Sequence, residues 1–433
     1  MTTLSHTSAA RRSILDEDVA SDRLAVRAVA AAVAFMPLLR PGFNGDGTPA
    51  DVLIALAIGA TLLWLGTYRL TVRLPLLWPV GLMVAAGTLA AALGDYPVEG
   101  AFAVAVDIAL FAWCASVANV CRTPEALATV LRTWTWSALA WGGLLVVAAF
   151  GGLPGLAGQG PEGGRAALTF VSPNQAGNYF AISLFVLFAS PSPRRPAARA
   201  VAAAVMVTAL FLAASNAALG GALAGLILWW VLTVARRHGA VPAIAATTRI
   251  VASALVVVLV SARLDIVDAA RNSQTTVVRN TIGRSERSAE DRLAKLEQLR
   301  ELYLSGGLIG RGPASTKPVL SAGTHANVKS AHNDYVATIV ERGVVGAAGL
   351  ALLVGGLAAM AAAIAVRPLS RAFASVVRTP RPLVGALVAV ALAGMTHEIL
   401  HFRHVWALFG LVAAIYLWGR EDVPARARGG ASP

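Results

Sequence analysis

A short polar run, His332, Asn333, Asp334 and Tyr335, contains the residues of this sequence that are best suited to chemistry. A histidine can take up or release a proton near neutral pH, as general acid–base catalysis requires. The run stands where a polar stretch ends and an apolar one begins, so we expect a helix to start there, and a helix N-terminus attracts anionic groups. We therefore predict a catalytic role for His332 and substrate binding by its three neighbours.

The same run also has a purely structural interpretation. Asn333 or Asp334 would cap the helix, and Tyr335 would anchor it where an apolar segment meets water. His332 would then have no chemical role. The residue types alone leave both interpretations open.

Several arginines precede this run and suit a phosphate-bearing ligand. A guanidinium group donates two parallel hydrogen bonds to phosphate oxygens, and Arg292 is our first candidate for such a contact. For most of the others a solvated or headgroup-facing surface is the simpler interpretation. These other arginines, the neighbours of Arg292, are Arg279, Arg284 and Arg287.

Two further polar segments flank apolar stretches. In the segment from Ser172 to Asn178, Pro173 and Asn174 suit a helix start, and Asn174 is a candidate for substrate binding or for a cap alone. The string from His397 to His401 matches His-Glu-x-x-His, a zinc-binding pattern. It lies in a short turn with no evident third ligand, although His404 follows, so we predict no metal site and no cofactor.

The composition is that of a membrane protein. Of 433 residues, 57% are hydrophobic and only 14% are charged, against about a quarter charged in soluble domains. The formal net charge of +13 reflects charges in loops, and no nucleic-acid-binding motif accompanies it. Asp107 is the one carboxylate deep in an apolar segment, where acidic residues are functional candidates.

Segments of about 20 apolar residues span a bilayer as helices, and twelve stretches approach that length. The sequence therefore predicts an all-α polytopic membrane protein with about twelve transmembrane helices and one large, partly helical external loop. The predicted spans are 24–40, 50–67, 74–93, 100–120, 133–153, 175–190, 198–215, 217–235, 249–264, 334–366, 382–399 and 402–418. The stretch 334–366 exceeds the needed length, so part of it is expected to be a lead-in helix.

Loop charges give the orientation. Alternate loops hold twenty-one arginines, whereas the short loops between them hold only Arg40, Arg165 and Arg403. Arginine-rich short loops stay in the cytoplasm. We therefore expect cytoplasmic tails over 1–23 and 419–433, about nine spans over 24–264, a periplasmic loop over 265–333 and about three spans over 334–418. Within the loop, Leu293, Leu296, Leu299 and Leu302 predict an amphipathic helix over 288–304 that lies against the bundle or the membrane.

Together these features resemble the O-antigen ligase and Wzy polymerase superfamily. The resemblance rests on the spans, the late external loop, the run from His332 to Tyr335, the motif Glu341–Gly346 and the segment Phe170–Asn174. It implies a bacterial inner-membrane enzyme with its active face in the periplasm. It also implies inverting transfer of a glycan from undecaprenyl pyrophosphate to a hydroxyl of lipid A–core or another glycan, without metal. His332 would activate or orient that hydroxyl and Arg292 would hold the departing pyrophosphate.

One position departs from the family pattern. Family members often have Ser-Arg after the seventh span, and this chain has Ser215-Asn216. Asn216 can donate a hydrogen bond to a substrate but supplies no charge. Arg165, Arg284 or Arg287 would compensate, or the donor differs, or activity is reduced. A polymerase of the same superfamily, a transporter or flippase, and a non-catalytic scaffold remain as alternatives.

Overall fold

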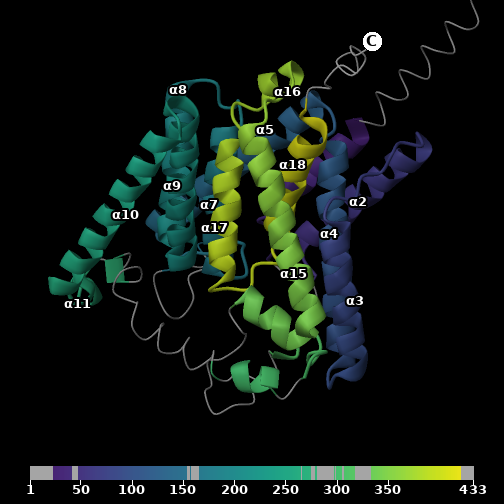
Figure 1. The fold of residues 1–433 in the computed structure, drawn as a ribbon. Coiled ribbons are helices and arrows are strands. Elements are labelled where there is room, and N and C mark those ends of the chain that lie inside the picture. Colours follow the sequence, from purple (N-terminus) through teal and green to yellow (C-terminus); the bar gives the residue numbers. More distant parts are fainter. Residues whose placement is uncertain are drawn as a thin grey trace, which may run out of the picture.

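The computed structural model describes residues 23–40, 47–153, 157, 165–264, 266–274, 278–279, 297, 299–304, 307–316 and 333–420. In this part of the chain the protein is helical, and its long helices stand side by side as a bundle (Figure 1). We call the end where α7, α9, α15 and α18 begin the outer end, and the opposite end, which carries α16, the inner end. These names follow the predicted orientation; the outer end is at the bottom of Figure 1.

A first helix covers 23–35. The other long helices are α2 (Pro49–Thr67), α3 (Leu77–Leu93), α4 (Pro97–Val120), α5 (Pro124–Phe150), α7 (Pro173–Ala189), α8 (Pro196–Ala213), α9 (Asn216–His238), α10 (Ala240–Arg263), α15 (Asp334–Val366), α17 (Arg381–Gly394) and α18 (Arg403–Trp418). Two short helices are α11 (Ile266–Arg271) and α16 (Arg371–Val376).

Helix starts follow from local sequence. Six of the described helices, α2, α4, α5, α7, α8 and α17, have a proline in their first turn, where a missing N–H costs nothing. At five starts among the described helices a hydroxyl side chain accepts a hydrogen bond from the backbone N–H three residues on. These caps are Thr48, Thr123, Ser172, Ser215 and Ser370.

Each of the twelve predicted spans contains a helix. Six of the described helices, α2, α4, α5, α8, α9 and α15, are long and apolar enough to cross a membrane. The structure thus supports an all-helical integral membrane protein, and the number of about twelve spans remains a prediction.

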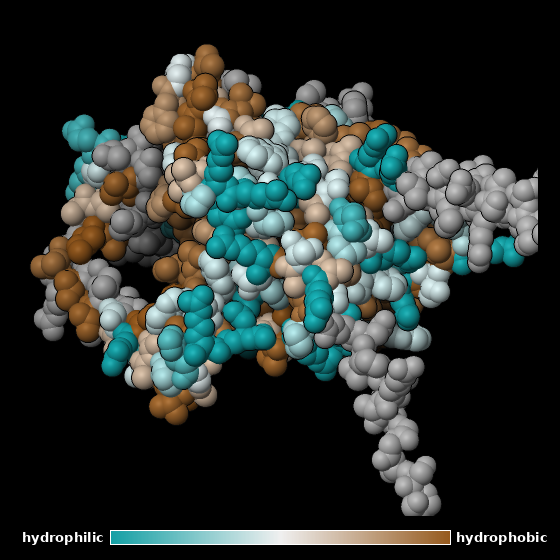
Figure 2. All heavy atoms as spheres, turned by 90° about the horizontal axis from the view of Figure 1, so that it is seen from above, coloured by the Kyte–Doolittle hydropathy of each residue, from teal (hydrophilic) through white to brown (hydrophobic). Residues whose placement is uncertain are grey.

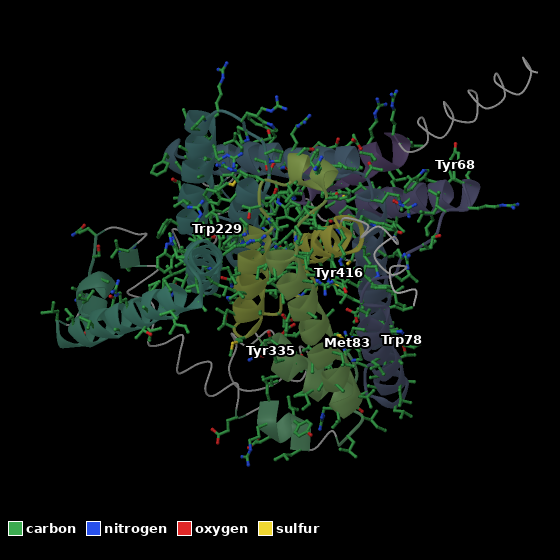
Figure 3. The ribbon with its side chains drawn as sticks, turned by 45° about the horizontal axis from the view of Figure 1, so that its top comes forward. Tyr68, Trp78, Met83, Trp229, Tyr335 and Tyr416 are labelled. Carbon is green, nitrogen blue, oxygen red and sulfur yellow. The ribbon has the colours of Figure 1, made fainter. Side chains whose placement is uncertain are left out.

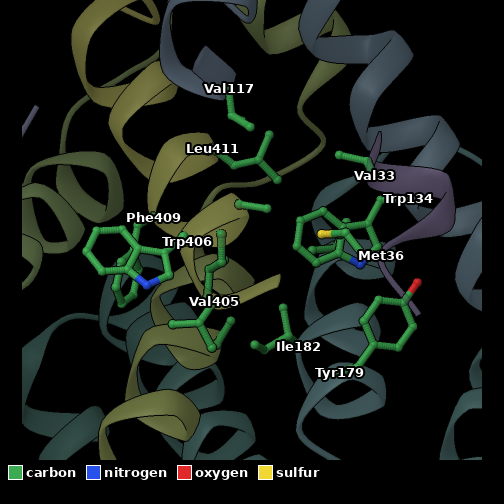
Figure 4. Packing of buried hydrophobic residues seen from close by; sticks show 14 of the residues in the cluster. Val33, Met36, Val117, Trp134, Tyr179, Ile182, Val405, Trp406, Phe409 and Leu411 are labelled. Atoms are coloured by element: carbon green, nitrogen blue, oxygen red, sulfur yellow. The ribbon is translucent and has the colours of Figure 1, made fainter. Parts of the chain in front are cut away.

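The best-buried helices are α7 and α18, which run through the middle of the bundle. Most of their side chains are buried, and α18 packs closely on α4 where Gly410 meets Val117. Figure 4 shows the large core side chains that fill the space between them, among them Trp134, Tyr179 and Trp406. The Trp134 indole donates to the Ser183 hydroxyl at 2.9 Å, so its polar edge is paired.

Small residues let α9 approach α17. A Cβ on Gly221 would lie 2.7 Å from the carbonyl oxygen of Ala389, and one on Gly225 would collide with the backbone of Gly385. Membrane helices associate through such small-residue faces because apolar side chains gain little by leaving lipid. This contact fixes α17, and with it the turn that follows, beside α9.

Candidate functional site

The start of α15 is bonded to the turn between α17 and α18. The Asn333 side chain caps α15 by accepting from the backbone N–H groups of Tyr335 and Val336, and it also donates to the carbonyl oxygen of Met395 at 2.9 Å. The Tyr335 hydroxyl donates to the carbonyl oxygen of Ala391 at 3.0 Å. In Figure 3, Tyr335 lies low on the molecule, toward the outer end.

Asp334 makes the deepest of these contacts. Its carboxylate accepts from the backbone N–H groups of Ile399 at 2.9 Å and Leu400 at 3.3 Å, and the residue is only 7% exposed. Asn333 therefore caps α15, as the structural interpretation predicted, whereas the clasp that Asp334 forms with residues 399–400 and the bond from Tyr335 to α17 were not predicted. They also fix the backbone that directly follows His332, which itself lies outside the described residues.

A kink divides α15 into a lead-in segment and a main segment (Figure 1). Gly343 has φ +64° and ψ −163°, values that other residues rarely adopt. The break frees backbone groups, and the incoming chain pairs with them: Arg311 N–H donates to Val340 O at 3.0 Å, and Val344 N–H donates to Leu308 O at 3.0 Å. The lead-in segment expected from sequence is present, and residues 308–312 of the loop pair with its kink.

Glu341 and Arg342 secure the kink from either side. The Glu341 carboxylate accepts from the backbone N–H and the hydroxyl of Thr316. Arg342 forms an ion pair with Asp107 of α4 at 2.5 Å, with side-chain exposures of 10% and 20%. The motif Glu341–Gly346 thus joins α15 to the loop and to α4, and the isolated carboxylate of the sequence has a partner.

The described part of the predicted loop helix packs on the lead-in segment. Residues 299–304 are helical, and Leu299 is fully buried against Ala337 and Val340. The prediction that this helix lies against the bundle holds for its C-terminal end. Arg284, Arg287 and Arg292 lie outside the described residues.

Three segments meet around Arg165 at the outer end. Its guanidinium donates to the Asn174 side-chain oxygen at 2.6 Å and to the carbonyl oxygen of Ala213 at 3.3 Å. Asn174 is in the first turn of α7, and Asn216 opens α9 three residues after Ala213. The two helix starts are in contact, since a Cβ on Gly177 would lie 2.8 Å from the Cβ of Ser215. Arg165 thus stands beside the position where the sequence departs from the family.

The histidines of the last turn do not converge. His404 is buried, and its Nε2 lies 2.9 Å from the Asn178 side-chain oxygen. Arg403, the residue before it, forms a bidentate pair with Asp51 at the start of α2, with both distances 2.7 Å. Among the described residues no three His, Cys, Asp or Glu side chains are grouped closely enough to hold a metal ion.

An apolar groove opens beside the clasp. It has a volume of about 500 Å³, is lined mainly by α15 and α17, and reaches Asp334, Tyr335 and Leu400 at its outer end. Almost all of its other lining side chains are aliphatic. Such a surface suits a hydrocarbon chain in the membrane.

Residues 201–351, which run from α8 past the kink of α15, match the family model described as O-antigen ligase. This stretch is similar to the O-antigen ligase family. The match confirms the predicted resemblance to the O-antigen ligase and Wzy polymerase superfamily for these residues, and it supports a membrane enzyme of that general kind. No curated protein is found to match the chain.

The structure contains interactions that sequence reasoning missed. The pairing of Arg342 with Asp107 joins residues far apart in the chain, and only the rarity of a carboxylate in an apolar segment pointed to Asp107. The bonds from the 399–400 backbone to Asp334 leave no sequence signal, because every residue type except proline offers the same main-chain donor. Arg165 was detectable as one of three arginines in the short external loops.

Proposed function

We propose that this protein is an inverting glycosyltransferase that uses an undecaprenyl-pyrophosphate-linked glycan at the periplasmic face. An acceptor hydroxyl attacks the first sugar carbon of the donor glycan, a new glycosidic bond forms, and the bond from that carbon to the pyrophosphate oxygen breaks. The hydroxyl proton passes to His332, and undecaprenyl pyrophosphate leaves as an anion. The family match over residues 201–351 carries this proposal.

Two contacts of neighbouring described residues support the assignment of both catalytic roles to one region. His332 directly precedes Asn333, which is bonded to Met395. Arg292 precedes Leu299 by seven residues, and Leu299 is buried against the lead-in segment of α15. Both residues therefore connect through short stretches of chain to the same helix. In this role His332 acts on the acceptor, and Arg292 binds the pyrophosphate as negative charge builds on it.

Arg165 supplies the charge that Asn216 lacks in this proposal. It lies where α7 and α9 begin, and helix N-termini favour an anion. Its contacts with Asn174 and Ala213 set its position, and Asn174 and Asn216 offer further hydrogen bonds to the donor. Arg284 and Arg287 are proposed to add to this attraction. The outer part of the apolar groove would receive the first isoprene units of the donor, with lipid A–core or another glycan as acceptor.

The test is the surface-glycan profile of a deletion strain complemented with variants. We expect His332→Ala and Arg292→Ala to abolish complementation. Arg300→Ala and His238→Ala are matched controls, since both residues are exposed and lie outside the proposed site. They should restore the wild-type profile at equal protein levels.

The gel also separates the alternatives. Loss of all capped lipid A–core with accumulation of lipid-linked glycan supports a ligase, whereas a single repeat unit left on the core supports a polymerase of the same superfamily. If His332→Ala and Arg292→Ala both restore the wild-type ladder, the catalytic roles are refuted, and a scaffold or a transporter takes their place.

A further inference from the structure

Five arginines line one cavity at the inner end of the bundle. The cavity has a volume of about 630 Å³ and lies between the inner ends of α9, α15 and α17, next to α16. Among the described residues, no acidic side chain lines it. Figure 2 views this end of the molecule, where hydrophilic side chains gather over the middle of the bundle. The arginines are Arg236, Arg237, Arg367, Arg378 and Arg381.

The contacts of these arginines within the described residues leave their charges largely unneutralised. Arg236 donates to the carbonyl oxygens of Ala365 and Val366, both at 3.1 Å, and so closes the C-terminal end of α15. Within the described part of the chain, none of the five guanidinium groups pairs with a carboxylate. Like charges that converge on one cavity repel each other, so an anion that occupies it is favoured. The excess of arginine on a cytoplasmic face explains their number but not their arrangement around a cavity.

The surroundings of the cavity indicate a lipid. Phe188 and Trp229 line it with ring centroids 5.0 Å apart, and tryptophan is typical of the headgroup level of a membrane. The cavity also adjoins the apolar groove. Leu232 and Val366 line the groove, and the residues that follow them, Thr233 and Arg367, line the cavity. A ligand with a phosphate head and a hydrocarbon tail matches both parts.

We propose that this cavity binds the phosphate headgroup of an anionic phospholipid of the cytoplasmic leaflet. The guanidinium groups hold the phosphate oxygens, and an acyl chain enters the inner end of the apolar groove. Basic pockets between membrane helices on the cytoplasmic side bind such headgroups in other proteins. The site is at the opposite end of the bundle from the proposed catalytic residues, so it stands independently of the proposed reaction.

The test uses the purified full chain in nanodiscs that contain phosphatidylcholine with increasing cardiolipin or phosphatidylglycerol. Native mass spectrometry measures the lipid that stays bound, and thermal unfolding measures the stabilisation. Arg367→Gln/Arg381→Gln should weaken anionic-lipid binding roughly 30-fold, because each arginine at a membrane surface contributes about a fivefold change. Arg194→Gln/Arg195→Gln, which removes two exposed arginines of the same face outside the cavity, should change binding less than about twofold.

Three results would overturn the proposal. Equal loss in the control variant would mean diffuse surface attraction, and equal retention of phosphatidylcholine would mean no headgroup recognition. Displacement of the lipid by millimolar inorganic pyrophosphate would mean that the ligand is a soluble phosphate. If the glutamine variant does not fold, Arg367→Lys/Arg381→Lys replaces it: this variant keeps the charge but loses the planar fork, so binding should fall severalfold. Unchanged lipid binding in the lysine variant would also refute recognition by these guanidinium groups.

Discussion

Replacing Asp334 with alanine should release the turn between α17 and α18. The Asp334 carboxylate is almost fully buried and accepts two main-chain hydrogen bonds, from Ile399 at 2.9 Å and Leu400 at 3.3 Å. A hydrogen bond to a charged group contributes about 1.5–3 kcal/mol, and the longer bond is the weaker one. We therefore expect a loss of about 3–4 kcal/mol in the free energy that holds the turn against the start of α15.

Amide hydrogen exchange reports on this turn directly. In Asp334→Ala the amides of Ile399 and Leu400 should exchange on the order of 10- to 100-fold faster, since each loses its acceptor. The amide of His397 is an internal control, because it donates to Ala393 O at 2.9 Å within the end of α17. It should accelerate much less than the other two.

A conservative variant separates positioning from chemistry. Asp334→Asn keeps one side-chain oxygen as acceptor, so it should protect one of the two amides and retain part of the glycan-transfer activity. If Asp334→Ala leaves both amides protected, the clasp does not hold the turn and the reasoning from these contacts is wrong. If exchange is fast but activity is unchanged, the turn does not contribute to the site.

Other consequences follow from the same outer end. Arg342→Gln should lower the unfolding free energy by about 3–5 kcal/mol by leaving Asp107 unpaired, and Asp107→Asn in the same chain should recover part of that loss in thermal unfolding. Gly343→Ala should lower the free energy of unfolding by about 2 kcal/mol or more, because an alanine at φ +64° is strained and its Cβ would collide with Leu308 O. Faster proteolysis within residues 307–316 would reveal this loss. Arg165→Lys should keep more activity in the complemented strain than Arg165→Gln, and equal activity would exclude a role for its charge.

Much of the fold could be predicted because hydrophobic length and helix caps are local properties. The apolar stretches became helices near the expected bounds, and Asn333 caps α15 as its position before an apolar run indicated. The kink required more than local sequence. A glycine such as Gly343 signals conformational freedom, but the bonds that fix its angles come from residues 308–316, which precede it by about thirty positions. Long-range pairs such as Arg342 with Asp107 remain invisible for the same reason.

The lead-in segment of α15 anchors the long loop at several points. Leu299 packs on this segment, Thr316 is bonded to Glu341 within it, and Asn333 caps it. The stretch 317–332, which ends in His332, therefore has only sixteen residues between two fixed points rather than the whole of 265–333. Loop-closure entropy grows with the logarithm of length, so closing the shorter stretch costs about 1 kcal/mol less than closing the whole loop. Because the anchors lie outside the proposed catalytic residues, changes within 317–332 can alter the substrate while the bundle keeps its packing.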